Sequence, residues 1–124
     1  MGCHGIRGAT TVARNDAQEI LAATRILLER MVSDNAISPE MIASVFFTAT
    51  GDLDAVYPAR AARELGWLQT PLLCARDMDV STGVPRCVRV LLHANINGAP
   101  DRLHHVYLGD AQSLRPDWVG EVKT

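Results

Sequence analysis

The chain contains far fewer helix-like segments than strand-like segments, and this imbalance restricts the folds that it can adopt. Helical patterns cover residues 16–34 and 59–65. Strand patterns cover residues 2–12, 42–50, 70–78, 85–94 and 104–108. Because two helices cannot cover both faces of five strands, the sequence predicts an α+β fold, a mixed five-stranded sheet with helices on one face.

The longer helix has a clear start and a clear apolar stripe. Asp16 stands at an N-cap position, and Glu19 follows three positions later in a capping-box arrangement. Residues at helical spacing continue to about Asp34, and they are Ile20, Leu21, Thr24, Leu27, Leu28, Met31 and Val32. The shorter helix lies between Pro58 and Gly66, which favour a helix start and a helix end respectively.

The segment 85–94 is apolar on both sides. Alternation places Val88, Val90 and Leu92 on one face, and the other face, which carries Arg89, is still largely apolar. Helices cover only one face of the predicted sheet, so we expect another subunit to bury the second face.

Length and composition favour a single domain over residues 1–124, in which residues from about 112 to 124 have the pattern of a C-terminal tail. Hydrophobic residues form 48% of the chain and charged residues 21%, which is typical of a globular protein. The net charge is −2 and the arginines are dispersed, so we expect no nucleic-acid partner. No apolar run approaches the roughly 18 residues of a membrane helix, and no secretory signal pattern opens the chain. We expect a cytoplasmic protein without membrane contact.

Two arginines stand inside segments that otherwise have the character of buried strands. Arg7 lies between Gly5 and Gly8 in the first strand, and Arg89 lies among valines and leucines. A guanidinium group cannot lose its charge, and burying it without an anion is unfavourable by several kcal/mol. The two positions therefore predict a pocket for an anionic ligand.

The sequence offers no sign of a metal site or of a bound cofactor. No phosphate loop, dinucleotide fingerprint or nucleophile-elbow serine is present. The cysteines and histidines also lack the spacing of zinc ligands, and they are Cys3, Cys74, Cys87, His4, His93, His104 and His105.

Several short stretches, taken in order, resemble the AroH-type chorismate mutases over nearly the whole chain. They are 5–12, 49–50, 52–53, 55–56, 58–59, 63–65, 78–80, 87 with 89–90, 105–108 and 114–117. The resemblance implies an isomerase that rearranges chorismate to prephenate in the shikimate pathway, in aromatic amino acid biosynthesis. It also implies a homotrimeric pseudo-α/β barrel with its sites between subunits, and a reaction without cofactor, metal or covalent intermediate.

The resemblance assigns roles to individual residues. Arg89 matches the main cation, which reaches the ether oxygen and a substrate carboxylate. Arg7 matches a second carboxylate-binding arginine and Tyr107 its hydroxyl partner. Cys74 and Asp77 match positions that hydrogen-bond the ring hydroxyl, although the family commonly has glutamate where this chain has Asp77.

The resemblance also implies that other matching positions reach the site from a neighbouring subunit or from a mobile C-terminal segment, the tail from about 112 to 124. The neighbour's set is Tyr57, Ala59, Arg60, Arg63 and Leu73, and the C-terminal set is Leu114 and Arg115. The family commonly has phenylalanine at the first of these positions and lysine at the third.

Two other function classes fit an arginine-lined cleft. One is a trimeric imine or enamine deaminase of the Rid type, which has a similar fold and a carboxylate-binding arginine. The other is a non-catalytic module that binds an anionic metabolite. Release of ammonia from an imine, or binding without turnover, distinguishes these alternatives from a mutase.

Overall fold

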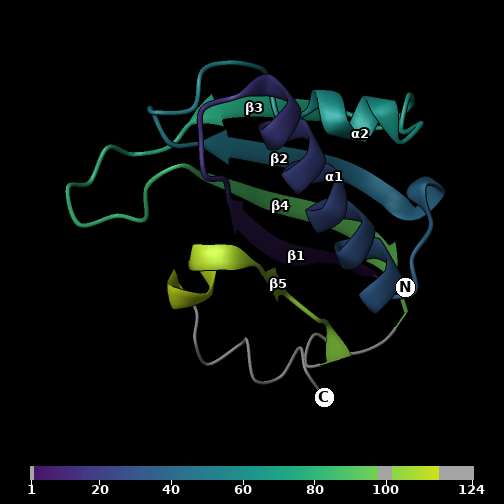
Figure 1. Cartoon of the computed structure of the whole chain (residues 1–124). Coiled ribbons are helices and arrows are strands. Elements are labelled where there is room, and N and C mark those ends of the chain that lie inside the picture. The colour runs from purple at the N-terminus through teal and green to yellow at the C-terminus, as the bar shows by residue number, and fades with distance from the viewer. Residues whose placement is uncertain (1, 98–101, 115–124) are drawn as a thin grey trace.

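Five strands form one mixed sheet in the order β3-β2-β4-β1-β5 (Figure 1). The computed structural model describes residues 2–97 and 102–114. The strands are β1 (Gly2–Thr11), β2 (Ile42–Ala49), β3 (Leu72–Arg76), β4 (Cys87–Ile96) and β5 (Val106–Tyr107). The helices are α1 (Ala17–Asp34) and α2 (Arg60–Glu64), with 3-10 turns η1 (Pro39–Met41) and η3 (Gly109–Leu114). Strand β4 is antiparallel to both β1 and β2, whereas β3 and β5 are parallel to their neighbours, so the predicted mixed sheet is confirmed.

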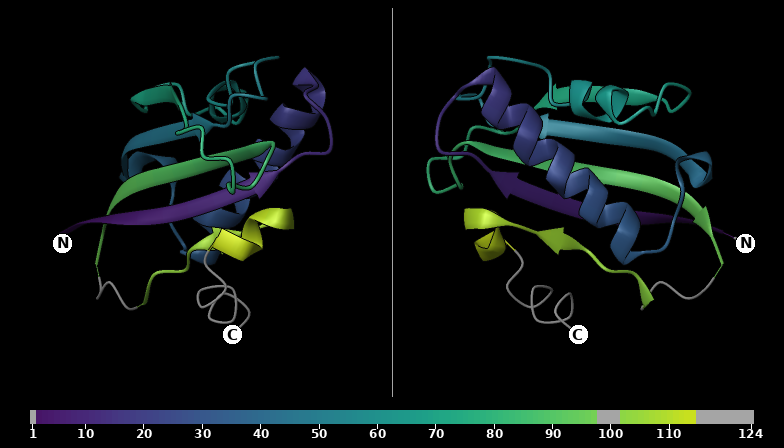
Figure 2. Two further views of the ribbon diagram at one scale, coloured as in Figure 1. Left: turned by 90° about the vertical axis from the view of Figure 1, so that its left-hand side faces the viewer. Right: turned by 45° about the vertical axis from the view of Figure 1, so that its right-hand side comes forward.

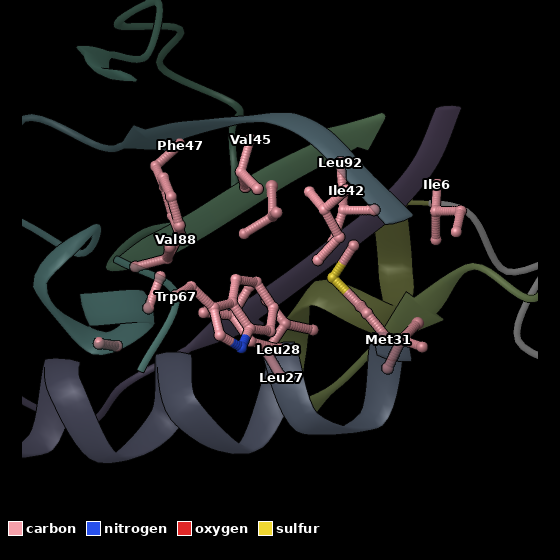
Figure 3. Close-up of a cluster of buried hydrophobic side chains, with 14 of the residues drawn as sticks. Ile6, Leu27, Leu28, Met31, Ile42, Val45, Phe47, Trp67, Val88 and Leu92 are labelled. Atoms are coloured by element: carbon pink, nitrogen blue, oxygen red, sulfur yellow. The ribbon is translucent and has the colours of Figure 1, made fainter. Parts of the chain in front are cut away.

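Helix α1 crosses one face of the sheet and covers it (Figure 2). Its fully buried side chains include Leu27, Leu28 and Met31, which meet side chains of the sheet in the core shown in Figure 3. The buried residues of β4 are Val88, Val90 and Leu92, in agreement with the predicted alternation. Ala61 and Ala62 of α2 join the same core, together with Trp67.

Half of the predicted capping box forms at the start of α1. The backbone N–H of Glu19 donates to Oδ2 of Asp16 over 3.0 Å, so Asp16 is the N-cap as predicted. The Asp16 N–H donates to the Arg14 carbonyl instead of to Glu19. The Glu19 carboxylate accepts a hydrogen bond of 2.6 Å from Nε of Arg14. In a full capping box the Asp16 N–H would donate to the Glu19 carboxylate. Both groups are hydrogen-bonded to Arg14 instead.

Gly8 allows α1 to lie close to the middle of β1. A Cβ atom at this position would lie 2.5 Å from Sδ of Met31 and 3.1 Å from Cδ1 of Leu27. A larger residue in place of Gly8 would push the helix away from the strand. The neighbouring Arg7 then has its side chain on the opposite face of the sheet, since side chains alternate along a strand.

Several boundaries differ from the prediction. Strand β3 has five residues and β5 has two, both shorter than expected. Residues 112–114, where the predicted tail begins, lie in η3, and the mobility of the tail stays a prediction. The rest of that predicted tail lies outside the described residues.

The sheet face opposite α1 carries apolar side chains that the chain itself leaves exposed. Phe46, Leu73 and Leu91 have exposed fractions of 41%, 58% and 36%. They come from β2, β3 and β4 at paired register positions, so they form one patch.

Among the described residues, no helix combines the length and hydrophobicity needed to cross a membrane.

The N-cap at Asp16 supplies a direct test of how α1 begins. Replacing it with alanine removes the acceptor for an otherwise unsatisfied helix N–H, so we expect Asp16→Ala to lower the free energy of unfolding by about 0.5–2 kcal/mol. Asp16→Asn keeps an acceptor oxygen and serves as the matched control. Urea denaturation at one fixed protein concentration measures both variants, and equal effects of the two would contradict the capping role.

Candidate functional site

The register of four strands places three predicted site residues on the sheet face opposite α1. Ala9 of β1 pairs with Tyr107 on one side and with Arg89 on the other. Arg7 lies two residues before Ala9, and alternation puts it on the same face. Arg89 in turn pairs with Thr48 of β2. The sheet therefore brings together side chains that are up to about 100 residues apart in the chain.

Arg89 and Asp77 form a two-pronged ion pair. Nε of Arg89 donates to Oδ2 of Asp77 over 2.7 Å, and Nη2 donates to Oδ1 over 2.6 Å. The same carboxylate accepts the Met78 backbone N–H at Oδ1 and the Thr48 hydroxyl at Oδ2. The Asp77 side chain is only 12% exposed and that of Arg89 is 42% exposed. Four donors thus hold Asp77 in place, and Asp77 holds the guanidinium.

The electrostatics of the pair keep both groups charged. Burial alone raises the pKa of Asp77, but hydrogen bonds and charge from Arg89, with the Met78 N–H and the Thr48 hydroxyl, outweigh it and hold that pKa below its ordinary value. The hydrogen bonds to Asp77 raise the pKa of Arg89, although burial opposes the change. A fixed ion pair at neutral pH follows from both shifts.

A cavity of about 220 Å³ lies beside this ion pair. Its lining includes Asp77, Arg89 and the loop residues Met78 and Val80. Leu114 of η3 also lines it, which brings the predicted C-terminal residue to the cation. Arg115, the other predicted C-terminal residue, lies outside the described residues.

The loop between Asp77 and Arg86 forms one wall of this cavity, and hydrogen bonds hold it in place at Arg86. The Arg86 backbone N–H donates to both carboxylate oxygens of Asp52, at 3.2 and 3.0 Å. Arg86 has a φ of +47°, a backbone conformation that non-glycine residues rarely adopt. The Thr50 hydroxyl donates to Asp52 and accepts the Cys87 N–H, so β2 and β4 hold the anchor from both sides.

A second and larger cavity, of about 1120 Å³, lies at the β3 edge of the sheet. Its lining includes every residue that was predicted to come from a neighbouring subunit, and they are Tyr57, Ala59, Arg60, Arg63 and Leu73. The structure thus separates the predicted site residues into two groups on one chain. We call the Arg89 cavity the cation cavity and this one the edge cavity.

Cys74 lines the edge cavity, whereas Asp77, with which it was predicted to share a substrate hydroxyl, lines the cation cavity. In the sheet register Cys74 pairs with Phe47, whose side chain is buried in the core, whereas Asp77 follows the end of β3. Burial raises the pKa of the Cys74 thiol, although a backbone hydrogen bond to Ala59 opposes the shift. The thiol is therefore a protonated hydrogen-bond donor at neutral pH.

Sequence reasoning missed three residues that support the site. Thr48 and Asp52 hold the ion pair and its loop, and His105 accepts the Arg7 backbone N–H at Nδ1 over 3.0 Å. Alternation along 42–50 would have placed Thr48 on the same face as Phe46. The backbone N–H groups that the other two accept, those of Arg86 and Arg7, lie 34 and 98 positions away, so spacing within one segment does not indicate these contacts. Within the described part of the chain, no cluster of His, Cys, Asp and Glu could hold a metal ion.

Comparisons with known proteins show which family the chain resembles. The family described as chorismate mutase type I matches residues 3–118. Chorismate mutase AroH of Bacillus subtilis (strain 168) is 44% identical over 118 residues, which cover 94% of this chain and 93% of the relative. Chorismate mutase AroH of Thermus thermophilus is 47% identical over 114 residues, covering 91% and 93%. The solved structure of a chorismate mutase from Clostridium thermocellum has a TM-score of 0.88 and 44% identity, and the match covers 89% of this chain and 98% of that chain.

A mixed sheet with a paired guanidinium beside a cavity suits an enzyme that acts on an anionic substrate. The chain belongs to the type I chorismate mutase family, which confirms the resemblance found in the sequence. Its enzymatic function is that of a chorismate mutase.

The Asp77–Arg89 pair predicts how stability depends on pH. Because the pKa of Asp77 is lowered on folding, the pair stabilises the fold above the ordinary aspartate pKa of about 3.9, and this contribution is lost as the pH falls through the lower folded value. We expect the wild type to exceed Asp77→Asn in free energy of unfolding by a constant amount from about pH 7 to about pH 5, and the gap to shrink below about pH 4.

Urea denaturation across this range measures the gap. Asp79→Asn, which removes an exposed carboxylate two residues away, is the matched control. A gap that stays constant into the acid range, or that is missing at neutral pH, contradicts the ion-pair account.

Proposed function

We propose that the chain converts chorismate to prephenate at a composite site, which joins the cation cavity of one copy to the edge cavity of a second copy. The observation that carries the proposal is the separation of the two groups of predicted residues. Arg89 and Asp77 line one cavity, and Arg63 and Cys74 line the other. Among the described residues the two linings share Thr50 alone, so we assign the two groups to different copies of the chain at one shared site.

The chemistry matches the residues of the cation cavity. In the rearrangement an ether C–O bond breaks as a C–C bond forms, and negative charge gathers on the ether oxygen. A guanidinium carries five N–H donors. Asp77 receives two from Arg89, and the other three have no acceptor among the described residues. Arg89 therefore has donors for the ether oxygen and a carboxylate, and the ion pair fixes where they point.

The remaining residues select the compact conformer of the substrate. Arg7 binds a second carboxylate with the Tyr107 hydroxyl as its partner. The Asp77 carboxylate accepts a hydrogen bond from the ring hydroxyl of the substrate. The Cys74 thiol of the second copy donates a hydrogen bond to the same hydroxyl. Holding the reacting carbons together accounts for rate without a nucleophile or a change of protonation.

A ring of three copies fits the exposed apolar patch of Phe46, Leu73 and Leu91. A cyclic assembly brings two different surfaces of the chain into contact at every interface, so each edge cavity meets a neighbour's cation cavity. Burying the patch also removes apolar area from water, which favours association. We place this trimer in the cytoplasm, where the free thiols of Cys74 and Cys87 stay reduced.

The activity is measured as the loss of chorismate ultraviolet absorbance, with prephenate identified as the product. We expect turnover whose rate is flat from about pH 7 to pH 8.5, because Asp77 and Arg89 stay charged and burial keeps the Cys74 thiol protonated. A bell-shaped profile centred near neutrality would contradict this mechanism, because it requires a general acid or base. Release of ammonia from an imine indicates the deaminase instead, and chorismate binding without turnover indicates the metabolite-binding module.

Mixed assemblies test whether two copies share a site. We expect Arg89→Ala and Arg63→Ala to be inactive alone, and their co-expressed mixture to regain activity at about a quarter of its sites, since each site takes one cavity from each of two neighbours. The control is the double variant Arg63→Ala/Arg89→Ala co-expressed with wild type under the same conditions. Purified mixtures that stay as inactive as the single variants would show that one chain supplies both arginines.

A further inference from the structure

We propose that His105 is a positioning residue that holds Arg7 and Tyr107 in fixed relation to each other; this inference rests on the substrate-binding roles given above to those two residues. Neither the sequence patterns nor the family resemblance assigned His105 any part in the site. Its imidazole Nδ1 accepts the backbone N–H of Arg7 over 3.0 Å, a contact between residues 98 positions apart.

Strand β5 pairs with β1 over two residues, so the hydrogen bond from the Arg7 N–H to His105 is a substantial part of the attachment between these strands. The two residues of β5, Val106 and Tyr107, pair with Gly8 and Ala9 of β1. The Leu108 N–H donates to the Ala9 carbonyl just beyond the pair. His105 directly precedes β5, and its side chain extends the attachment of the strand as far as Arg7. The imidazole nitrogen thus accepts the Arg7 N–H, as a backbone carbonyl would if β5 were longer.

A second anchor immediately before His105 fixes the backbone of the segment but does not reach the site. The Asn35 side chain, at the end of α1, accepts the His104 N–H at 2.8 Å and donates to the His104 carbonyl at 2.9 Å. These bonds use only backbone atoms of His104, so the His104 side chain is dispensable for them. Of the two anchors, only the bond made by His105 ends on a residue that binds the substrate.

The bond also fixes the chemical state of the ring. A backbone N–H can only donate, so Nδ1 of His105 must present its lone pair and the ring proton must lie on Nε2. Asparagine carries Oδ1 on Cγ, the same number of bonds from the backbone as Nδ1 of histidine. Glutamine places its acceptor one bond further out and cannot reproduce the contact. Because of this difference, His105→Asn and His105→Gln form a matched pair of variants.

The expected kinetic effect falls on binding. The His105 bond ends on the Arg7 backbone, so its loss leaves both side chains able to select the compact conformer but weakens their hold on a carboxylate that is present in the substrate and the transition state alike. We expect His105→Ala and His105→Gln to raise KM about tenfold and to leave kcat within about threefold of wild type. His105→Asn should keep KM near the wild-type value, and so should the control His104→Ala.

Amide hydrogen exchange at Arg7 tests the bond without any assay of activity. We expect Arg7 N–H protection to be lost in His105→Gln and kept in His105→Asn, with circular dichroism showing that both variants are folded. Equal protection and equal KM for the two amides would overturn the proposal. Loss of the amide contact without a change in KM would also overturn it, since the bond would then be structural only. Absence of chorismate turnover in the wild type is a failure of the proposed function, and the exchange result still decides whether the bond exists.

Discussion

The hydrophobic core and the position of the Arg89 cation both depend on the two faces of β4, the central strand of the sheet. One set of alternating residues, Val88, Val90 and Leu92, is buried under α1. The other set carries Arg89 onto the opposite face. The core packing of one face therefore fixes the position of the cation on the other, because a shift of register by one residue would exchange the two sets. Rigidity at the site follows from close packing beneath it.

The ion pair adds orientation to this position. Asp77 is a residue shorter by one methylene than the glutamate common in the family, and it still engages Arg89 with both oxygens. Support from the Met78 N–H and the Thr48 hydroxyl explains how a short side chain holds the guanidinium. A charge that is already oriented does not have to reorganise during the reaction, which is the main source of electrostatic catalysis.

Sequence patterns predicted the elements whose signals are local, and they failed where contacts are distant. The N-cap at Asp16, the apolar stripe of α1 and the alternation along β4 all follow from spacing within one segment. The hydrogen bond from the Arg86 N–H to Asp52 and the one from the Arg7 N–H to His105 join residues 34 and 98 positions apart, and no spacing within one segment predicts them. The roles given to Arg7, Arg89 and the edge-cavity residues came from family resemblance, and the assembly of three copies stays a prediction.

The central claim is that Arg89 acts as a planar, oriented cation and not merely as a positive charge. The most direct test compares the turnover of chorismate by Arg89→Lys and Arg89→Ala with that of the wild type, using folded protein in each case. An ammonium group cannot reproduce the two-pronged contact with Asp77 while it donates to the substrate, so the account predicts that kcat/KM falls by at least about a hundred- to thousandfold in both variants. Near wild-type kcat in Arg89→Lys would contradict the account, since charge alone would then be sufficient.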